Sequence, residues 1–163
     1  MKRFLIVLLL LITLSGCANV AKKADNDQRY YDLVTLLVER ENFEKKPAFF
    51  DLSYDTSHDN DGYRYFLIID NPKVAMKDVE IVAMEKNSDA SKQMAASVGI
   101  FAENEYNMIP GQANPAKGYV KGISVSGLMS SPDSTICILI QWKSADLMNS
   151  YREFYEIEVH AND

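Results

Sequence analysis

The sequence has few of the side chains from which catalytic and metal-binding sites are most often built. Its 163 residues include two cysteines and two histidines, His58 and His160. It contains no Walker loop, no G-x-S-x-G elbow, no H-E-x-x-H zinc motif and no C-x-x-C pair. We therefore expect a protein without catalytic activity and without a cofactor.

Long hydrophobic runs are also missing, except at the N-terminus. Lys2 and Arg3 precede the uncharged run 4–14, FLIVLLLLITL, which has the length of the hydrophobic region of a signal peptide. A helix needs roughly 20 apolar residues to cross about 30 Å of hydrocarbon, so this run is too short to span a membrane. No later stretch approaches that length, and we expect the rest of the chain to lie in water.

The end of this run resembles a known processing motif. Leu14-Ser15-Gly16-Cys17 is similar to the lipobox of bacterial lipoproteins. The resemblance implies that diacylglycerol is attached to Cys17, that cleavage between Gly16 and Cys17 removes residues 1–16, and that the new N-terminus is often acylated, for example with palmitate. Two or three acyl chains anchor a protein stably, at about 0.8 kcal/mol per buried methylene. The alternative is an ordinary secretory signal with a chance cysteine at its cleavage site.

The residue after Cys17 bears on location in the cell envelope. In Gram-negative lipoproteins an aspartate at this position commonly signals retention in the inner membrane, and here the residue is Ala18. For a Gram-negative source, the resemblance therefore implies the periplasmic face of the outer membrane. For a Gram-positive source, it implies the outer face of the cytoplasmic membrane. The sequence leaves the type of envelope open.

Removal of residues 1–16 leaves 147 of the 163 residues, which is enough for one domain. Loss of Lys2 and Arg3 changes the formal charge from −6 to −8. Such a surface repels nucleic acid and anionic lipid headgroups, so neither is an expected ligand. With Cys17 occupied by lipid, Cys137 has no disulfide partner in the chain. We expect Cys137 to be a small hydrophobic core residue, because it lies within an apolar run.

The following segments predict a tether and one helix. Residues 17–27 form the tether, which is small, polar and charged, and ten extended residues reach at most about 33–36 Å. Residues 28–42 predict an amphipathic helix capped by residues 25–27. This helix either packs on the domain or docks on a partner or on the bilayer surface. Its apolar stripe consists of Tyr30, Leu33, Val34, Leu37 and Val38.

From Pro47 the apolar period changes to two, which predicts strands. About seven strands separated by turns predict a mainly β fold, an antiparallel β-sandwich over 47–161. The predicted strands are 50–54, 63–70, 79–83, 97–102, 120–128, 135–143 and 151–160.

Two segments resemble bacterial immunoglobulin-like domains. The first is YRYFLIIDNPKVAMKDVEIVAM (63–84), and the second is the closing hairpin ILIQWKSADLMNSYREFYEIEV (138–159). The resemblance covers about residues 48–160 and implies an immunoglobulin-like sandwich. Trp142 is not flanked by paired cysteines, so the Cys-Trp-Cys core of antibody domains is absent. Such folds host many functions, and the resemblance assigns none.

The segment 57–62, SHDNDG, resembles the start of a calcium loop, but Ile68 stands where an EF-hand needs glutamate. Asp55, Asp59 and Asp61 are weak candidates for a cation site in a hairpin loop. The alternative is a solvated turn, in which Asp, Asn and Gly are common.

The segment 87–118 is rich in loop-forming residues, with a short helix expected at 90–96. Long connections in compact domains are often functional, so this segment is the candidate recognition surface. A variable loop without a partner is the alternative. Met84 and Met148 are expected to fill gaps in the core.

These observations favour a non-catalytic, lipid-anchored protein of the bacterial envelope that binds another envelope protein as an accessory subunit of an assembly. The alternative is a carrier or sensor that holds a small ligand between the two sheets, which requires an open cavity. A remote alternative is an envelope hydrolase, which requires His58 or His160 beside a nucleophile. The sequence leaves the partner and the oligomeric state open.

Overall fold

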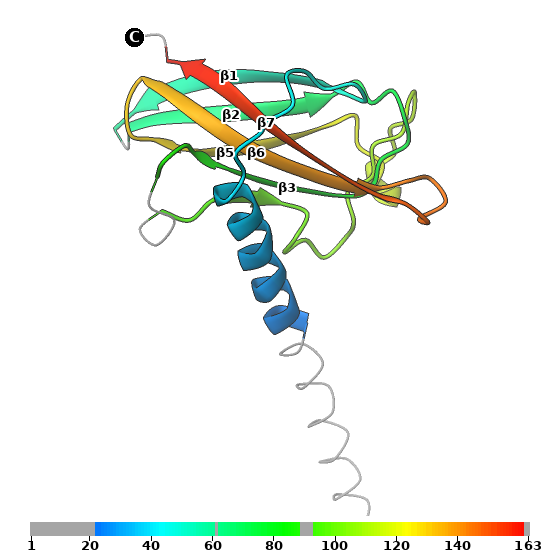
Figure 1. Cartoon of the computed structure of the whole chain (residues 1–163). Helices are drawn as coiled ribbons and strands as arrows, with labels where there is room; N and C mark the ends of the chain where they lie inside the picture. Colours follow the sequence, from blue (N-terminus) through cyan, green and yellow to red (C-terminus); the bar gives the residue numbers. More distant parts are fainter. Residues whose placement is uncertain (1–21, 61, 89–92, 162–163) are drawn as a thin grey trace, which may run out of the picture.

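The computed structural model describes residues 22–60, 62–88 and 93–161. In this part of the chain, one α-helix is followed by seven strands in two antiparallel sheets (Figure 1). The three-stranded sheet has the order β1-β2-β5, and the four-stranded sheet has the order β4-β3-β6-β7. The elements are β1 (Asp51–Asp59), β2 (Gly62–Asp70), β3 (Lys77–Glu85), β4 (Ala96–Val98), the 3-10 turn η1 (Pro115–Lys117), β5 (Gly122–Met129), β6 (Asp133–Lys143) and β7 (Ser150–His160).

The four-stranded sheet is the middle layer of the molecule. Its strands β3 and β6 are apolar on both faces, because each face packs against another element. One face packs on the three-stranded sheet and buries Ile81, Ile138 and Ile140 completely. The other face packs on the helix and buries Val82 and Leu139 completely. Successive side chains of a strand point to opposite faces, so β3 and β6 contribute to both hydrophobic clusters.

The described part of the helix packs its apolar side chains on the sheet only from Tyr30 onward. It is already formed at Lys22 and ends at Val38, and Figure 1 shows its first turns projecting away from the sheets. The Tyr30 hydroxyl donates a hydrogen bond to the Ala95 carbonyl oxygen at 2.9 Å, which joins the helix to the segment before β4. The buried residues of the helix are Tyr30, Leu33, Val34 and Leu37.

The prediction of an amphipathic helix over 28–42, capped by residues 25–27, is wrong in its extent and in its pattern. Residues 25–27 lie inside the helix, because the good helix formers at 22–24 extend it toward the N-terminus. Val38, a member of the predicted apolar stripe, is 56% exposed. After residue 38 the chain turns toward the edge of β7 instead of continuing the helix. Residues 22–27, which form part of the predicted tether, are therefore helical.

The strands lie in the predicted regions, but their ends differ, most of all for β1, β3 and β4. β3 covers Lys77–Glu85, whereas the predicted strand is 79–83. β1 continues to Asp59, through most of the segment 55–61 that was expected to be a loop, because it pairs with β2 up to Asp59↔Gly62. β4 has three residues, Ala96–Val98, of which two fall in the predicted strand 97–102. It ends where Gly99 turns the chain with φ +92°, and a Cβ there would lie 2.2 Å from the Val79 carbonyl oxygen.

The N-terminal assignments lie outside the described residues. These are the signal peptide 1–16, the cleavage site at Gly16 and Cys17, and lipid attachment at Cys17. In the ranges that the structure describes, no helix combines the length and the apolar composition needed to cross a membrane. Of the short helix expected at 90–96, residues 93–95 are not helical and Ala96 belongs to β4.

Two of three expectations about single apolar side chains are confirmed. Cys137 is 6% exposed beneath the helix, and burial raises the pKa of its thiol to about 11. Met84 is also buried. Met148 is 82% exposed, because it lies in the turn between β6 and β7 and not on a strand face.

We expect the helix to be an integral part of the folded unit. Leu37→Ala removes a side chain that is 2% exposed between helix and sheet, and it should lower the free energy of unfolding by about 2–5 kcal/mol. The adjacent Leu36→Ala is the control, since Leu36 is 38% exposed, and its change should stay within about 0.5 kcal/mol. Urea denaturation followed by fluorescence measures both. Equal midpoints for the two variants would contradict the packing described.

Candidate functional site

The outer face of the four-stranded sheet is polar where the helix no longer covers it. Glu80 of β3, Gln141 of β6 and Arg152 of β7 are aligned by the strand register, since Glu80 pairs with Gln141 and Gln141 pairs with Arg152. Side chains at such positions lie side by side on one face of a sheet. Arg29 of the helix, which lies over this face of the sheet, contacts Glu80 in the same row of side chains.

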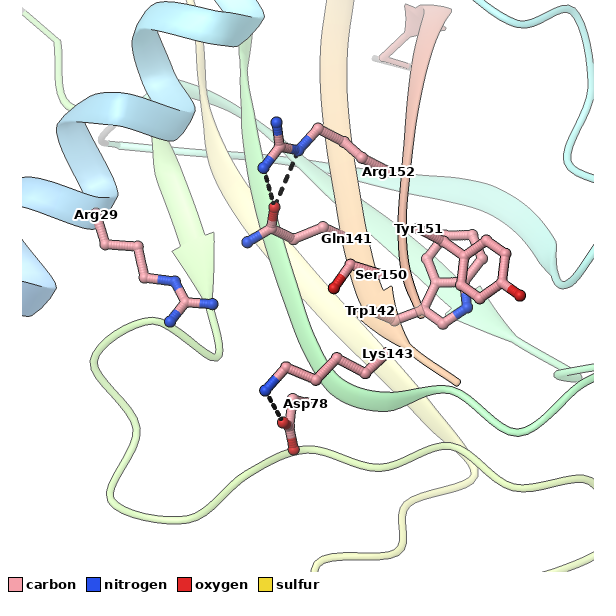
Figure 2. A pocket seen from close by; sticks show the side chains of 8 residues that line it. All are labelled: Arg29, Asp78, Gln141, Trp142, Lys143, Ser150, Tyr151 and Arg152. Carbon is pink, nitrogen blue, oxygen red and sulfur yellow. Dashed lines mark hydrogen bonds and ion pairs between the residues drawn. The ribbon is translucent and has the colours of Figure 1, made fainter. Parts of the chain in front are cut away.

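These four side chains form one hydrogen-bonded chain. Arg29 Nη2 lies 2.9 Å from Glu80 Oε2, and Gln141 Nε2 donates to the same oxygen at 2.5 Å. Arg152 donates from Nε and Nη2 to Gln141 Oε1, at 3.0 and 2.7 Å (Figure 2). Glu80 is 8% exposed, and its buried carboxylate is balanced by the Arg29 guanidinium.

In the described part of the chain, the positive charge of Arg152 is not compensated by a carboxylate, because its hydrogen-bond partner is the side chain of Gln141. The amide of Gln141 holds the guanidinium in a fixed orientation, but the amide is neutral. Among the described residues, no carboxylate lies within ion-pair distance of Arg152. Arg29 and Lys143, in contrast, each have a carboxylate partner, in Glu80 and Asp78 respectively. Three cations and two carboxylates therefore meet on this face.

Asp78 is placed by an irregularity in β3. The register shifts between Lys77 and Glu80, and Asp78 adopts φ +50° there, with its N–H donated to Asn107 Oδ1 at 3.2 Å. Lys143 Nζ donates to its carboxylate at 2.7 Å. Burial raises the pKa of Asp78, but the hydrogen bonds from Lys143 and from Glu105, with the charge of Lys143, outweigh it and lower the pKa overall.

Glu105 is the other member of this carboxyl pair. Its hydrogen bond to Asp78, followed by the negative charge of Asp78, raises the pKa of Glu105. When the two carboxyl groups hold one proton between them, Glu105 carries the proton and Asp78 is charged.

The polar row borders a hollow of about 410 Å³. Figure 2 shows Arg29 entering from the helix, Arg152 with Gln141 on one side and Lys143 with Asp78 on the other, with Ser150 between them. We call this hollow of about 410 Å³ the cationic hollow. It is lined by Arg29, Asp78, Gln141, Trp142, Lys143, Ser150, Tyr151 and Arg152.

A second hollow, of about 210 Å³, lies at the same hairpin and is lined mainly by apolar groups. Tyr151 of β7 stacks on Trp142 of β6 with ring centroids 5.4 Å apart, and Phe49 meets Trp142 edge-on at 6.0 Å. Trp142 is 2% exposed, whereas Tyr151 is 41% exposed and forms part of the rim. We call it the apolar hollow. It is lined by Phe49, Val74, Ala75, Trp142, Ser144, Ala145 and Tyr151.

The aspartates that the sequence suggested for a cation are spread along a strand. Asp55 lies in the middle of β1 and Asp59 at its end, and the four residue steps between them span about 13 Å along the strand. Asp61 lies outside the described residues. In the part of the chain that the structure describes, no three His, Cys, Asp or Glu side chains are grouped to hold a metal ion.

The two histidines have structural neighbours. His58 stacks on Tyr63 with ring centroids 4.3 Å apart. His160 Nδ1 lies 2.8 Å from Asp133 Oδ1, and both side chains are largely exposed. Within the described ranges, no hydroxyl or thiol hydrogen-bonds to either ring.

A buried carboxylate elsewhere has a structural explanation. Glu85 at the end of β3 accepts hydrogen bonds from Ser130 N at 3.1 Å, Ser130 Oγ at 2.7 Å and Ser134 Oγ at 2.6 Å. Three donors satisfy this carboxylate and fasten the β5–β6 turn to β3.

The predicted recognition segment 87–118 is partly built into the fold. Met108 is fully buried, and its N–H and carbonyl oxygen pair with Met76 at 2.8 Å. Asn107 is also buried and holds Gly118 and Val120 through main-chain hydrogen bonds. The exposed portions that remain include Met94, which is 77% exposed.

The residues of the two hollows were not among the candidates from sequence. The sequence offered one hint of this site, Arg152 in a strand otherwise rich in Glu and aromatic residues. The residues that surround Arg152 could not be predicted, because they depend on how the strands pair. No protein-family model, no curated protein and no solved structure matches the chain.

The carboxyl pair predicts a specific pH dependence. A raised pKa of Glu105 in the folded state contributes stability below its unfolded pKa of about 4.3, and this contribution is lost as the pH rises through the folded value. Glu105→Gln keeps a neutral donor toward Asp78, so its thermal midpoint should exceed that of the wild type at pH 7 and equal it near pH 3. The control Glu103→Gln should lack this pH dependence. Parallel pH profiles for Glu105→Gln and the wild type would contradict the pairing.

Proposed function

We propose that the chain is a non-catalytic, lipid-anchored protein of the bacterial envelope that binds another envelope protein through the surface around the β6–β7 hairpin. Anchoring is proposed at Cys17, on the basis of the lipobox Leu14-Ser15-Gly16-Cys17. The proposed location is the periplasmic face of the outer membrane, or the outer face of the cytoplasmic membrane in a Gram-positive source.

The proposal is supported mainly by the β6–β7 hairpin, where charged, aromatic and exposed apolar side chains lie next to one another. The cationic hollow and the apolar hollow share Trp142 and Tyr151. The turn beside them exposes two further apolar side chains, Leu147 at 55% and Met148 at 82%. An oriented charge next to exposed apolar and aromatic groups is typical of a protein-binding surface.

We also propose an immunoglobulin-like topology for the sandwich. The strand order supports it: β1-β2-β5 faces β4-β3-β6-β7, and the chain passes between sheets after β2, β4 and β5. Such crossings are the Greek-key connections of immunoglobulin-like sandwiches.

The packing between the sheets counts against the carrier alternative. Five side chains that would have to leave space for a ligand are at most 2% exposed and pack in one cluster. They are Tyr65, Leu67, Ile138, Ile140 and Trp142. The histidine contacts described above give no support to the hydrolase alternative.

Lipid anchoring is tested by metabolic labelling with a palmitate analogue. We expect the wild type to incorporate the label and to sediment with membranes, and Cys17→Ser to do neither, because the thioether is lost. The control Cys137→Ala should behave as the wild type, since that thiol is buried beneath the helix. An unlabelled wild type, or a labelled Cys17→Ser variant, would refute the anchor.

Partner binding is tested by placing a photo-crosslinking amino acid at matched exposed positions in native membranes. Met148 in the β6–β7 turn is 82% exposed, and Met94 in the segment 87–118 is 77% exposed. Tyr54 on β1, 38% exposed, is the control on the other sheet. We expect one discrete adduct from Met148. An adduct from Met94 alone would indicate that the partner binds the segment 87–118 and not the β6–β7 hairpin. The absence of an adduct from all three positions would contradict partner binding.

A further inference from the structure

β7 is an edge strand, and part of its edge is open. It is the last strand of the four-stranded sheet. Phe154 uses its outward N–H and carbonyl groups to bind Glu44, at 2.8 Å each. Outward and inward main-chain groups alternate along an edge strand, so Ser150 and Arg152 also direct theirs away from β6. Within the described residues nothing hydrogen-bonds to these outward groups.

The two hollows lie on opposite faces of this open edge. Arg152 and Phe154 point to the face that carries the helix, where Phe154 joins the helix cluster. Tyr151 and Tyr155 point to the face between the sheets, where Tyr155 and Trp142 join the other cluster. The cationic hollow is therefore on one face of β7 and the apolar hollow on the other.

If a peptide strand paired with this edge of β7, its successive side chains would point alternately to the two faces of the sheet. One side chain would reach the cationic hollow, and its neighbour in sequence would reach the apolar hollow. The uncompensated charge of Arg152 suits a single carboxylate, which a guanidinium can bind with two hydrogen bonds. The lining of the apolar hollow suits a large aliphatic or aromatic side chain.

We propose that the β7 edge at Ser150–Arg152 binds an extended peptide segment of the partner protein, in which an acidic residue stands next to a bulky apolar residue. This inference rests on the proposed function and specifies what the partner presents. The main chain of the segment pairs with Ser150 and Arg152, its carboxylate binds Arg152, and its apolar side chain packs against Tyr151. Glu44 occupies the next position along the edge and limits the paired segment to a few residues.

The probe is a capped, fluorescein-labelled hexapeptide, Thr-Thr-Glu-Phe-Thr-Thr, together with the peptide in which Glu and Phe are exchanged. Binding to the full-length protein is measured by fluorescence polarisation. We expect at least one of the two peptides to bind. Replacement of its Glu by Gln, or Arg152→Gln in the protein, should weaken binding on the order of tenfold, the usual effect of losing a charge-assisted hydrogen bond. N-methylation of the peptide main chain should abolish it.

Arg64→Gln on β2 is the matched control, because it removes the same charge from the other sheet and should leave binding unchanged. If neither peptide binds, or if Arg152→Gln and Arg64→Gln have equal effects, the inference is wrong. The crosslinking experiment at Met148 tests partner binding independently of the peptide experiment. An adduct that forms equally in the wild type and in Arg152→Gln would sustain partner binding while overturning this mode of recognition.

Discussion

The fold depends on burying both faces of the four-stranded sheet. β6 shows this best, since Ile138 and Ile140 pack against the second sheet and Leu139 packs against the helix, all without exposed surface. Each fully buried aliphatic side chain contributes roughly 1.5–3 kcal/mol, so the two buried faces of this sheet supply a large favourable term in the free energy of folding. The helix is required for this arrangement, because without it the outer face of the sheet would present a hydrophobic patch to water.

The limited reach of the helix also creates the candidate site. The helix covers Leu139 and Phe154, and beyond them the sheet continues with Gln141, Arg152 and Lys143. Arg29 marks the boundary, since it lies on the helix but bonds to Glu80 of the sheet. The same geometry that buries the apolar half of this face therefore orients the polar half and leaves it accessible.

The sequence predicted the strands well, because a period of two and runs that are apolar on both faces depend on local order alone. The helix was predicted with wrong ends, since its start follows from helix formers at 22–24 and its end from the contact of Glu44 with the β7 edge. The site was missed, because Glu80, Gln141 and Arg152 are neighbours only through the pairing of three strands. Met148 was misplaced because its apolar character said nothing about its position in a turn.

Cys137 gives the molecule a built-in reporter. Its thiol lies in the cluster beneath the helix, and burial keeps it in the unreactive, protonated form. A thiol reagent added from water should therefore modify it faster in molecules whose helix has moved off the sheet. The rate of that modification therefore reports how often the helix moves away from the sheet.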